Sequence, residues 1–99
     1  SVAEAKALLE AKAAVFVDVR DPGSFSAGHI PGALHVNDHN LESFMDEADK
    51  ATPHVVYCYH GHSSLGGTGY FLENGFADVK SMDGGFSQWH QLCPDLVES

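Results

Sequence analysis

The stretch HVVYCYHGHSS, residues 54–64, joins a near-continuous apolar run to a short polar loop. Apolar runs of this length are typical of strands covered on both faces, as in parallel sheets, so residues 54–59 predict a strand. Cys58 lies near the end of that run, where the loop begins. In open α/β sheets, ligands bind beyond the carboxyl ends of the strands. The position of this thiol therefore indicates a functional site.

Helical and strand patterns alternate along the rest of the chain. In the first half we expect a helix over 2–12 capped by Ser1 and Glu4, a strand over 15–20, a turn at 21–25 and a loop entering a short strand over 28–36. A helix over 41–50, capped by Asn40, precedes the apolar run. After it we expect a helix over 63–74 ending at Asn74-Gly75, a strand over 77–83, and a glycine turn into a last helix over 84–92. This alternation predicts the α/β class with a mostly parallel sheet.

Composition excludes several classes of protein. A chain of 99 residues fits one domain. Its net charge of −9, with four lysines and one arginine, argues against a nucleic-acid partner, which would require clustered cations. No apolar stretch reaches the ~20 residues that cross a bilayer, so we expect no membrane partner. Two cysteines, Cys58 and Cys93, are fewer than a secreted domain of this size usually carries, which favours the cytoplasm.

The loop after Cys58 suits a thiolate, which is the reactive form of cysteine. Helix N-termini leave backbone N–H groups unpaired and carry the positive end of the helix dipole. A loop that curls around the sulfur would therefore stabilise its negative charge. Gly61 lies where such a curl requires positive φ or close backbone approach, and Ser63 or Ser64 is placed to cap the following helix. These residues predict a nucleophilic cysteine that binds an anion or carries negative charge itself.

Three segments extend the pattern: DVRDPGSFSAGHIPGA (18–33), CYHGHSS (58–64) and DGGFSQW (83–89). In this order and spacing they resemble the rhodanese family, in particular its single-domain thiosulfate sulfurtransferases of the GlpE type. With the helices between them they cover nearly the whole chain. The resemblance implies one rhodanese domain over 1–99, with three layers, α/β/α, around a central sheet of four to five strands. We find four strands, and the first family strand would precede Ser1 or be very short.

The resemblance also implies an activity. Cys58 would take the outer sulfur from thiosulfate or a similar donor, become a persulfide, and pass the sulfur to cyanide or to a thiol, including one on a partner protein. No cofactor or metal would be needed. Backbone amides of the loop would bind the substrate and the persulfide; the loop residues are Tyr59, His60, Gly61, His62 and Ser63.

Three other functions compete with this one. Cysteine phosphatases and arsenate reductases of related folds use Cys-x5-Arg to bind an oxyanion, whereas the sixth residue after Cys58 is Ser64. A zinc site is the second, because Cys58, His60 and His62 alternate and three ligands can suffice. The third is a persulfide carrier, sensor or rhodanese-like binding module without turnover. It stays open because this loop lacks the cationic side chain by which many rhodaneses hold an anionic donor.

Asp18 and Arg20 flank one residue of a predicted strand, so they point to the same face. We expect a structural ion pair or hydrogen bonds that join the strand end to neighbouring loops, and a direct role with the substrate is the alternative. Asp18, Arg20 and Ser64 are the candidates for a supporting position behind the cysteine loop.

Other side chains have structural interpretations. Trp89 and Phe86 are expected in the core, and His54 at the surface or at a sheet edge. Tyr59 is expected to pack or to line the mouth of a pocket. Three glycines within residues 66–69 disfavour a helix there, unless the helix packs closely against the sheet.

Overall fold

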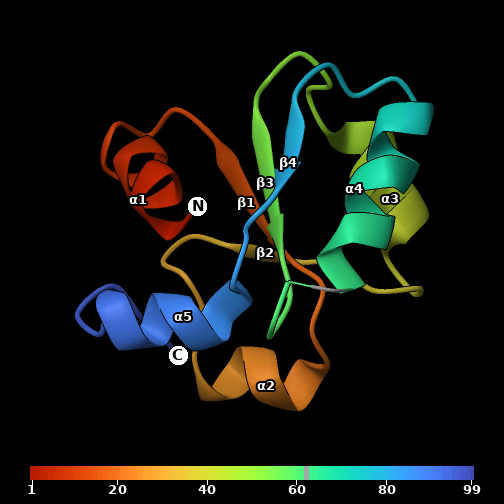
Figure 1. Cartoon of the computed structure of the whole chain (residues 1–99). Coiled ribbons are helices and arrows are strands. Elements are labelled where there is room, and N and C mark those ends of the chain that lie inside the picture. The colour runs from red at the N-terminus through yellow and green to blue at the C-terminus, as the bar shows by residue number, and fades with distance from the viewer. Residues whose placement is uncertain (62) are drawn as a thin grey trace.

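The computed structural model describes residues 1–61 and 63–99. Within these residues, four parallel strands form one sheet in the order β2-β1-β3-β4 (Figure 1). The strands are β1 (Val15–Asp18), β2 (Leu34–His35), β3 (His54–Tyr57) and β4 (Val79–Ser81). The α/β class and the parallel sheet are therefore confirmed.

Five helices in the described part of the chain surround this sheet. They are α1 (Val2–Glu10), α2 (Pro22–Ala27), α3 (Leu41–Glu47), α4 (Ser63–Glu73) and α5 (Gly85–Leu92). α1 and α5 cover one face, α3 and α4 cover the other, and α2 lies beyond the carboxyl ends of the strands (Figure 1). The arrangement has the three layers that were expected.

The position of strand β3 inside the sheet explains why its sequence is so apolar. All four of its residues are buried. Val55 and Tyr57 pack in the cluster under α1 and α5, whereas Val56 packs in the cluster under α3 and α4. Successive strand residues point to opposite faces, so in a strand covered on both sides the apolar residues Val55, Val56 and Tyr57 follow one another without alternation.

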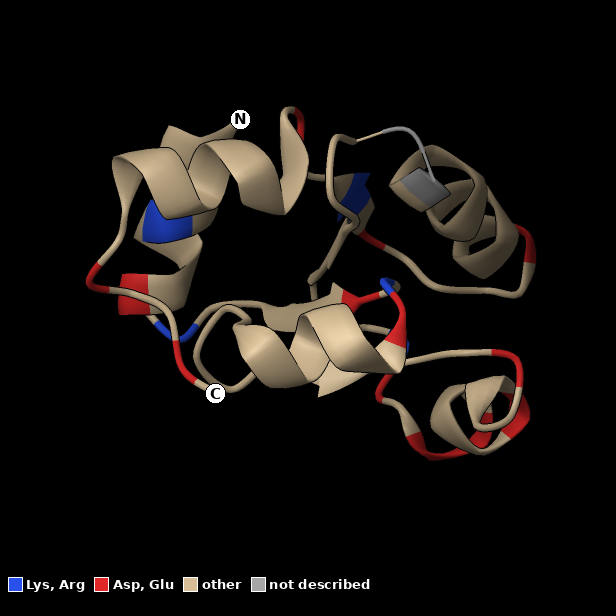
Figure 2. Ribbon diagram, turned by 90° about the horizontal axis from the view of Figure 1, so that it is seen from below, with Lys and Arg blue, Asp and Glu red and all other residues tan. Residues whose placement is uncertain are grey.

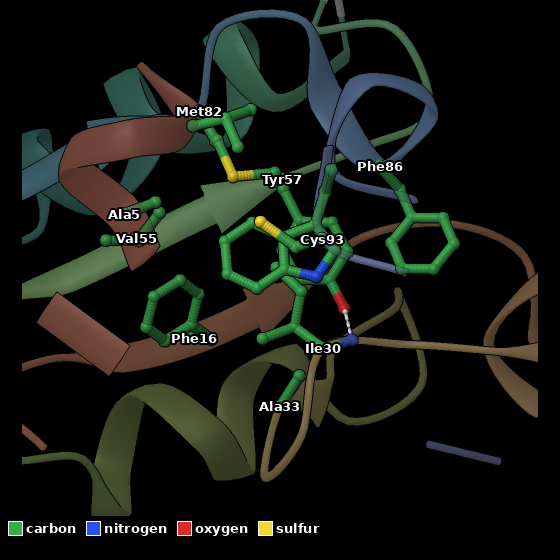
Figure 3. Close-up of a cluster of buried hydrophobic side chains, with 11 residues drawn as sticks. Ala5, Phe16, Ile30, Ala33, Val55, Tyr57, Met82, Phe86 and Cys93 are labelled. Carbon is green, nitrogen blue, oxygen red and sulfur yellow. Dashed lines mark hydrogen bonds between the residues drawn. The ribbon is translucent and has the colours of Figure 1, made fainter. Parts of the chain in front are cut away.

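The larger core cluster lies between the sheet and the α1–α5 layer. Trp89 is fully buried and Phe86 is 5% exposed, which confirms both as core residues. Figure 3 shows the hydroxyl oxygen of Tyr57 accepting a hydrogen bond from the backbone N–H of Ile30, at 3.1 Å. Cys93 lies in the same cluster as a buried thiol.

The N-terminal helix begins as its sequence predicts. The Ser1 hydroxyl accepts a hydrogen bond from the N–H of Glu4 and donates one to the Glu4 carboxylate, so the two residues form the N-terminal cap. None of the helices in the described residues has the length and apolar character needed to cross a membrane.

The turn predicted at 21–25 is wrong, because residues 22–27 form the helix α2. Asp21 caps this helix by accepting hydrogen bonds from the N–H and hydroxyl of Ser24. Pro22 occupies the first helical position, where its missing N–H costs nothing. The Asp-Pro pair thus starts a helix here instead of making an isolated turn.

Two other predictions are wrong. Asn40 precedes α3 but makes no capping hydrogen bond. Its side chain bonds the N–H of Asn37 and the carbonyl of His35 instead. His54 is not at the surface but 2% exposed, with Nδ1 2.7 Å from the carbonyl oxygen of Thr52. Its ring packs edge-on against Phe76, so an imidazole whose one nitrogen is satisfied locally fits a buried strand position.

Candidate active site

Cys58 follows β3 directly and lies at the carboxyl end of the sheet. Its sulfur faces the backbone of the loop that leads into α4. The N–H of Gly61 donates a hydrogen bond to Sγ at 3.1 Å, and the N–H of Ser64 donates one at 3.4 Å. The residue is 5% exposed. The loop therefore curls around the sulfur and points backbone donors at it.

Ser64 contacts the sulfur directly, closer than the supporting position expected for it. The residue is fully buried, and its Oγ lies 3.5 Å from Sγ of Cys58. On its other side, Oγ lies 2.6 Å from Oγ of Ser81. The two hydroxyls form a short chain that ends at the sulfur.

Ser81 was not expected from the sequence. It ends β4 and is paired in register with Val56 of β3, two residues before the cysteine. In a parallel sheet the carboxyl ends of neighbouring strands meet at one edge. A polar residue ending the neighbouring strand was the available signal, but using it requires knowing that β4 lies beside β3.

The surroundings lower the pKa of Cys58 below its ordinary value. Burial acts in the opposite direction and raises it, but the hydrogen bonds outweigh burial. They come from the hydroxyl and amide of Ser64 and from the backbone of Gly61 and His60. Because hydrogen bonds to the charged form favour it, the thiolate fraction near neutral pH is larger than for an ordinary cysteine.

Gly61 meets both conditions that a curled loop imposes. Its φ is +92°, a conformation that side-chain-bearing residues rarely adopt. A Cβ there would also lie 3.2 Å from the backbone nitrogen of Gly84. The loop therefore rests on the turn before α5.

The N-terminus of α5 holds the backbone of the cysteine loop. The N–H of Phe86 donates to the carbonyl of Cys58 at 2.8 Å, and the N–H of Ser87 donates to the carbonyl of Tyr59 at 2.9 Å. Gly85 has φ +61°, and a Cβ there would lie 2.5 Å from the carbonyl oxygen of Tyr59. Only glycine allows this approach, so the segment DGGFSQW is built around the cysteine loop.

Asp18 and Arg20 form a buried ion pair behind the loop. Nη2 of Arg20 lies 2.7 Å from the Asp18 carboxylate, and Nε lies 3.1 Å from both of its oxygens. Nη2 also donates to the carbonyl of Gly28. The guanidinium lies over the Phe86 ring, 4.1 Å from its centroid. Arg20 thus joins the ends of β1, α2 and α5 but does not belong to the cysteine loop.

The remaining predicted loop residues lie on the open side of the site. Tyr59 and His60 are exposed. The Tyr59 ring lies 5.6 Å from the Arg20 guanidinium and lines a cavity, so it is a wall residue rather than a core residue. His62 lies outside the described residues. Ser63 begins α4.

The geometry bears on two of the competing functions. The position that holds arginine in Cys-x5-Arg enzymes is occupied here by the buried Ser64, which bonds the sulfur. In the described residues, no three His, Cys, Asp or Glu side chains come together as a metal site. The zinc hypothesis also involves His62, which is outside this part of the chain.

Charge is distributed unevenly around the molecule. Figure 2 shows acidic residues gathered on α3, which carries Glu42, Asp46 and Glu47. The one arginine is neutralised by Asp18. The described part of the cysteine loop contains no lysine or arginine.

Comparison with known proteins identifies the family. A family model described as a rhodanese-like domain matches residues 1–92. The chain belongs to the rhodanese family.

Curated relatives of this rhodanese carry the same name. The thiosulfate sulfurtransferase GlpE of Pseudomonas fluorescens is 50% identical over 91 residues, which cover 92% of this chain and 83% of the relative. The thiosulfate sulfurtransferase GlpE of Shewanella oneidensis is also 50% identical over 91 residues, covering 92% and 90%. This chain is accordingly a sulfurtransferase of the rhodanese family.

Solved structures share the fold. The rhodanese-like domain of an Anabaena protein superimposes with a TM-score of 0.86 at 24% identity, covering 99% of this rhodanese and 76% of that chain. A Rhodopseudomonas palustris protein described as a possible tyrosine phosphatase gives a TM-score of 0.80 at 29% identity, covering 92% and 77%. The first likeness shows the fold alone.

Proposed function

We propose that Cys58 is the nucleophile of a thiosulfate sulfurtransferase. The Cys58 thiolate attacks the outer sulfur of thiosulfate, the S–S bond of thiosulfate breaks, and sulfite leaves with the bonding electron pair. Cys58 then carries a persulfide, which a second nucleophile, cyanide or a thiol, attacks at the outer sulfur to regenerate the thiolate. This is covalent catalysis in two displacements, and it uses no metal or cofactor.

The observation that carries the proposal is the set of hydrogen bonds to Sγ. Donors from Gly61 and Ser64 converge on a sulfur whose pKa lies below its ordinary value. The same donors, with those of Tyr59 to Ser63, would stabilise the negative charge of a persulfide. The names of the relatives support thiosulfate as the donor.

Two further points belong to this proposal. Residues 1–99 act as a single rhodanese domain, because the segment after residue 92 packs back on it: His29 and Glu98 exchange backbone hydrogen bonds of 2.8 and 2.9 Å. The protein works in the reducing cytoplasm, which the two unpaired, buried thiols support.

One observation favours a second candidate, a persulfide carrier, sensor or binding module without rapid turnover. Arg20, the one arginine, is occupied by Asp18 and the Gly28 carbonyl, and the described loop residues offer no other cationic side chain to an anionic donor. A carrier loaded by a partner would not need to bind free thiosulfate well.

Intact mass after incubation with thiosulfate tests the proposal and separates the two candidates. We expect the wild type to gain one sulfur, to lose it on adding cyanide, and Cys58→Ser to gain none. Failure of the wild type to gain sulfur from thiosulfate would reject the enzyme. Gain of sulfur from polysulfide in its place would then support the carrier.

A further inference from the structure

We propose that Ser81 is a positioning residue for the second half of the transfer. It donates its hydroxyl proton to Oγ of Ser64, so that the Ser64 proton points at the Cys58 sulfur whenever that sulfur is a thiolate. The inference rests on the proposed function and deepens it, because it assigns a residue to the step in which sulfur leaves Cys58.

Ser81 lies where the pattern of the sheet would place an apolar side chain. It ends β4 on the same face as Val79, which belongs to the core cluster under α3 and α4. A hydroxyl turned toward such a layer costs free energy unless it is hydrogen-bonded. Its partner is Oγ of Ser64, at 2.6 Å. The position of this serine therefore suits that hydrogen bond better than it suits core packing.

Both serines are held by regular secondary structure. The N–H of Met82 donates to the carbonyl of Val56 at 2.9 Å, so the pairing of β4 with β3 continues past Ser81. Ser64 lies in the first turn of α4, and its own N–H donates to Sγ of Cys58 at 3.4 Å. The chain of two hydroxyls is therefore fixed by a strand at one end and by the sulfur contact at the other.

A hydroxyl has one proton, so the direction of this chain depends on the charge of the sulfur. A thiol donates to Oγ of Ser64, whose own proton then points at Ser81. A thiolate has no proton to donate, so Ser64 donates to it and receives a hydrogen bond from Ser81. No third hydrogen bond of the Ser64 hydroxyl is found among the residues that the structure describes. Ser81 is thus the donor that keeps this buried oxygen satisfied while it bonds the thiolate.

The chain stabilises the thiolate more than it stabilises the persulfide. In the persulfide, Sγ forms two covalent bonds and the charge lies on the outer sulfur, so Ser64 donates to a nearly neutral atom. During unloading, cyanide attacks the outer sulfur, the bond between the two sulfurs breaks, and its electron pair stays on Sγ while thiocyanate leaves. Negative charge therefore develops at Sγ in this step, where the hydroxyl chain stabilises it and makes the thiolate a better leaving group.

The effect on loading has the opposite sign. The thiolate loses its charge as it attacks thiosulfate, and a better stabilised thiolate is a weaker nucleophile. At a pH where Cys58 is fully ionised, removal of the Ser81 hydroxyl should therefore slow unloading without slowing loading. A general disturbance of the loop would slow both steps, so the two rates separate a positioning role from a structural one.

Three substitutions separate the hydroxyl of Ser81 from its shape. Ser81→Ala removes the hydroxyl, Ser81→Thr keeps it, and Ser81→Val has the shape of the threonine variant without it. Ser43→Ala, at an exposed position of α3, is the matched control. Each protein is loaded with thiosulfate and then unloaded with cyanide at a pH above the midpoint of Cys58 alkylation, and the extra sulfur is followed by intact mass.

We expect Ser81→Ala and Ser81→Val to unload about threefold more slowly than the wild type, which is the scale of one hydrogen bond partly formed in the transition state. Both variants should load at least as fast as the wild type. Ser81→Thr and Ser43→Ala should keep the wild-type rates. If the added methyl group of the threonine disturbs the packing, the comparison of Ser81→Thr with Ser81→Val still isolates the hydroxyl.

A second measurement tests whether Ser81 acts through Ser64. The pH midpoint of alkylation by iodoacetamide should rise in Ser81→Ala, because the thiolate loses stabilisation. In the Ser64→Ala background, adding Ser81→Ala should change neither this midpoint nor the unloading rate any further, because the chain is already broken.

The outcomes distinguish the two proposals. If the wild type gains no sulfur from thiosulfate, the proposed function fails, and the role of Ser81 in unloading fails with it. If the wild type gains sulfur but Ser81→Val unloads as fast as Ser81→Thr, or slows loading and unloading alike, the assignment of Ser81 is overturned while the sulfurtransferase stands. An equal effect of Ser81→Ala with and without Ser64 would overturn it as well.

Discussion

At the scale of single residues, the chemistry depends on a thiol that burial alone would make less reactive. Burial raises the pKa of Cys58, and the hydrogen bonds of Ser64, Gly61 and His60 reverse that effect. Ser64 contributes twice, through its amide and its hydroxyl. Its hydroxyl is in turn positioned by Ser81.

Replacing the Ser64 hydroxyl should therefore raise the pKa of Cys58. In Ser64→Ala, the rate of alkylation by iodoacetamide should reach half its maximum at a higher pH than in the wild type, because the thiolate loses one hydrogen bond. Alkylation followed by mass against pH measures this. Ser43→Ala, on α3, is the control and should keep the wild-type profile. An unshifted midpoint in Ser64→Ala would show that the Ser64 hydroxyl does not lower the pKa of Cys58.

The residues also show what a sequence can and cannot predict about a site. Cys58, the curl at Gly61 and the pairing of Asp18 with Arg20 were predictable from strand ends and spacing. The contact of Ser64 with Ser81 was not, because it depends on which strands are neighbours. The burial of His54 was also missed, because its ring is satisfied by Thr52, two residues away.

At the scale of elements, the cysteine loop is held from below by α5. The N–H groups of Phe86 and Ser87 donate hydrogen bonds to the carbonyls of Cys58 and Tyr59. Gly85, which has no Cβ, lets the backbone of α5 come this close to the loop. The predicted turn at 84–85 was right about the start of the helix, but the sequence does not show against which backbone the turn packs. The missed helix α2 is only six residues long, so its apolar periodicity is too short to detect.

Gly85→Ala should separate the effect of a steric clash from that of backbone strain. Its Cβ would lie 2.5 Å from a backbone oxygen, at φ +61°. Gly32→Ala, at φ +77° with open space around it, bears strain alone. We expect a loss of about 1 kcal/mol in the free energy of unfolding for Gly32→Ala. For Gly85→Ala we expect more than about 2 kcal/mol together with slower sulfur loading. Urea denaturation measures the loss in the free energy of unfolding for both variants. Equal losses would argue against close packing at Gly85.

The glycines of α4 give a prediction with the opposite sign. Only Gly67 approaches the sheet, where a Cβ would lie 3.6 Å from Val56 Cγ1. A Cβ on Gly66 or Gly69 would meet nothing within 4 Å. Close packing therefore accounts for one of the three glycines. Gly66→Ala and Gly69→Ala should each raise the free energy of unfolding by roughly 0.5–1 kcal/mol, as in an exposed helix. Urea denaturation of each variant measures this change. A variant whose free energy of unfolding does not rise would indicate that α4 is strained at that position.

At the scale of the whole molecule, charge opposes the proposed donor. The protein has a net charge of −9, and thiosulfate is an anion. Long-range repulsion slows the encounter of like charges and is screened by salt, with a Debye length of about 30 Å at 0.01 M and about 8 Å at 0.15 M.

The rate of sulfur loading from thiosulfate should consequently rise with salt. Between about 10 and 150 mM sodium chloride we expect the second-order rate constant to increase severalfold. Loading from an uncharged organic trisulfide should change little and is the control. Stopped loading reactions analysed by intact mass give both rates. A thiosulfate rate that falls with salt would point to a local cationic site that outweighs the global charge.

The dependence of the cysteine loop on α5 has a consequence for how the protein is made. Cys58 leaves the ribosome well before Ser81, Phe86 and Ser87, the residues that complete its surroundings. A nascent chain that ends before α5 carries the thiol but lacks the backbone donors that hold the loop. The lowered pKa of this thiol therefore depends on surroundings that are complete only when synthesis of the domain is almost finished.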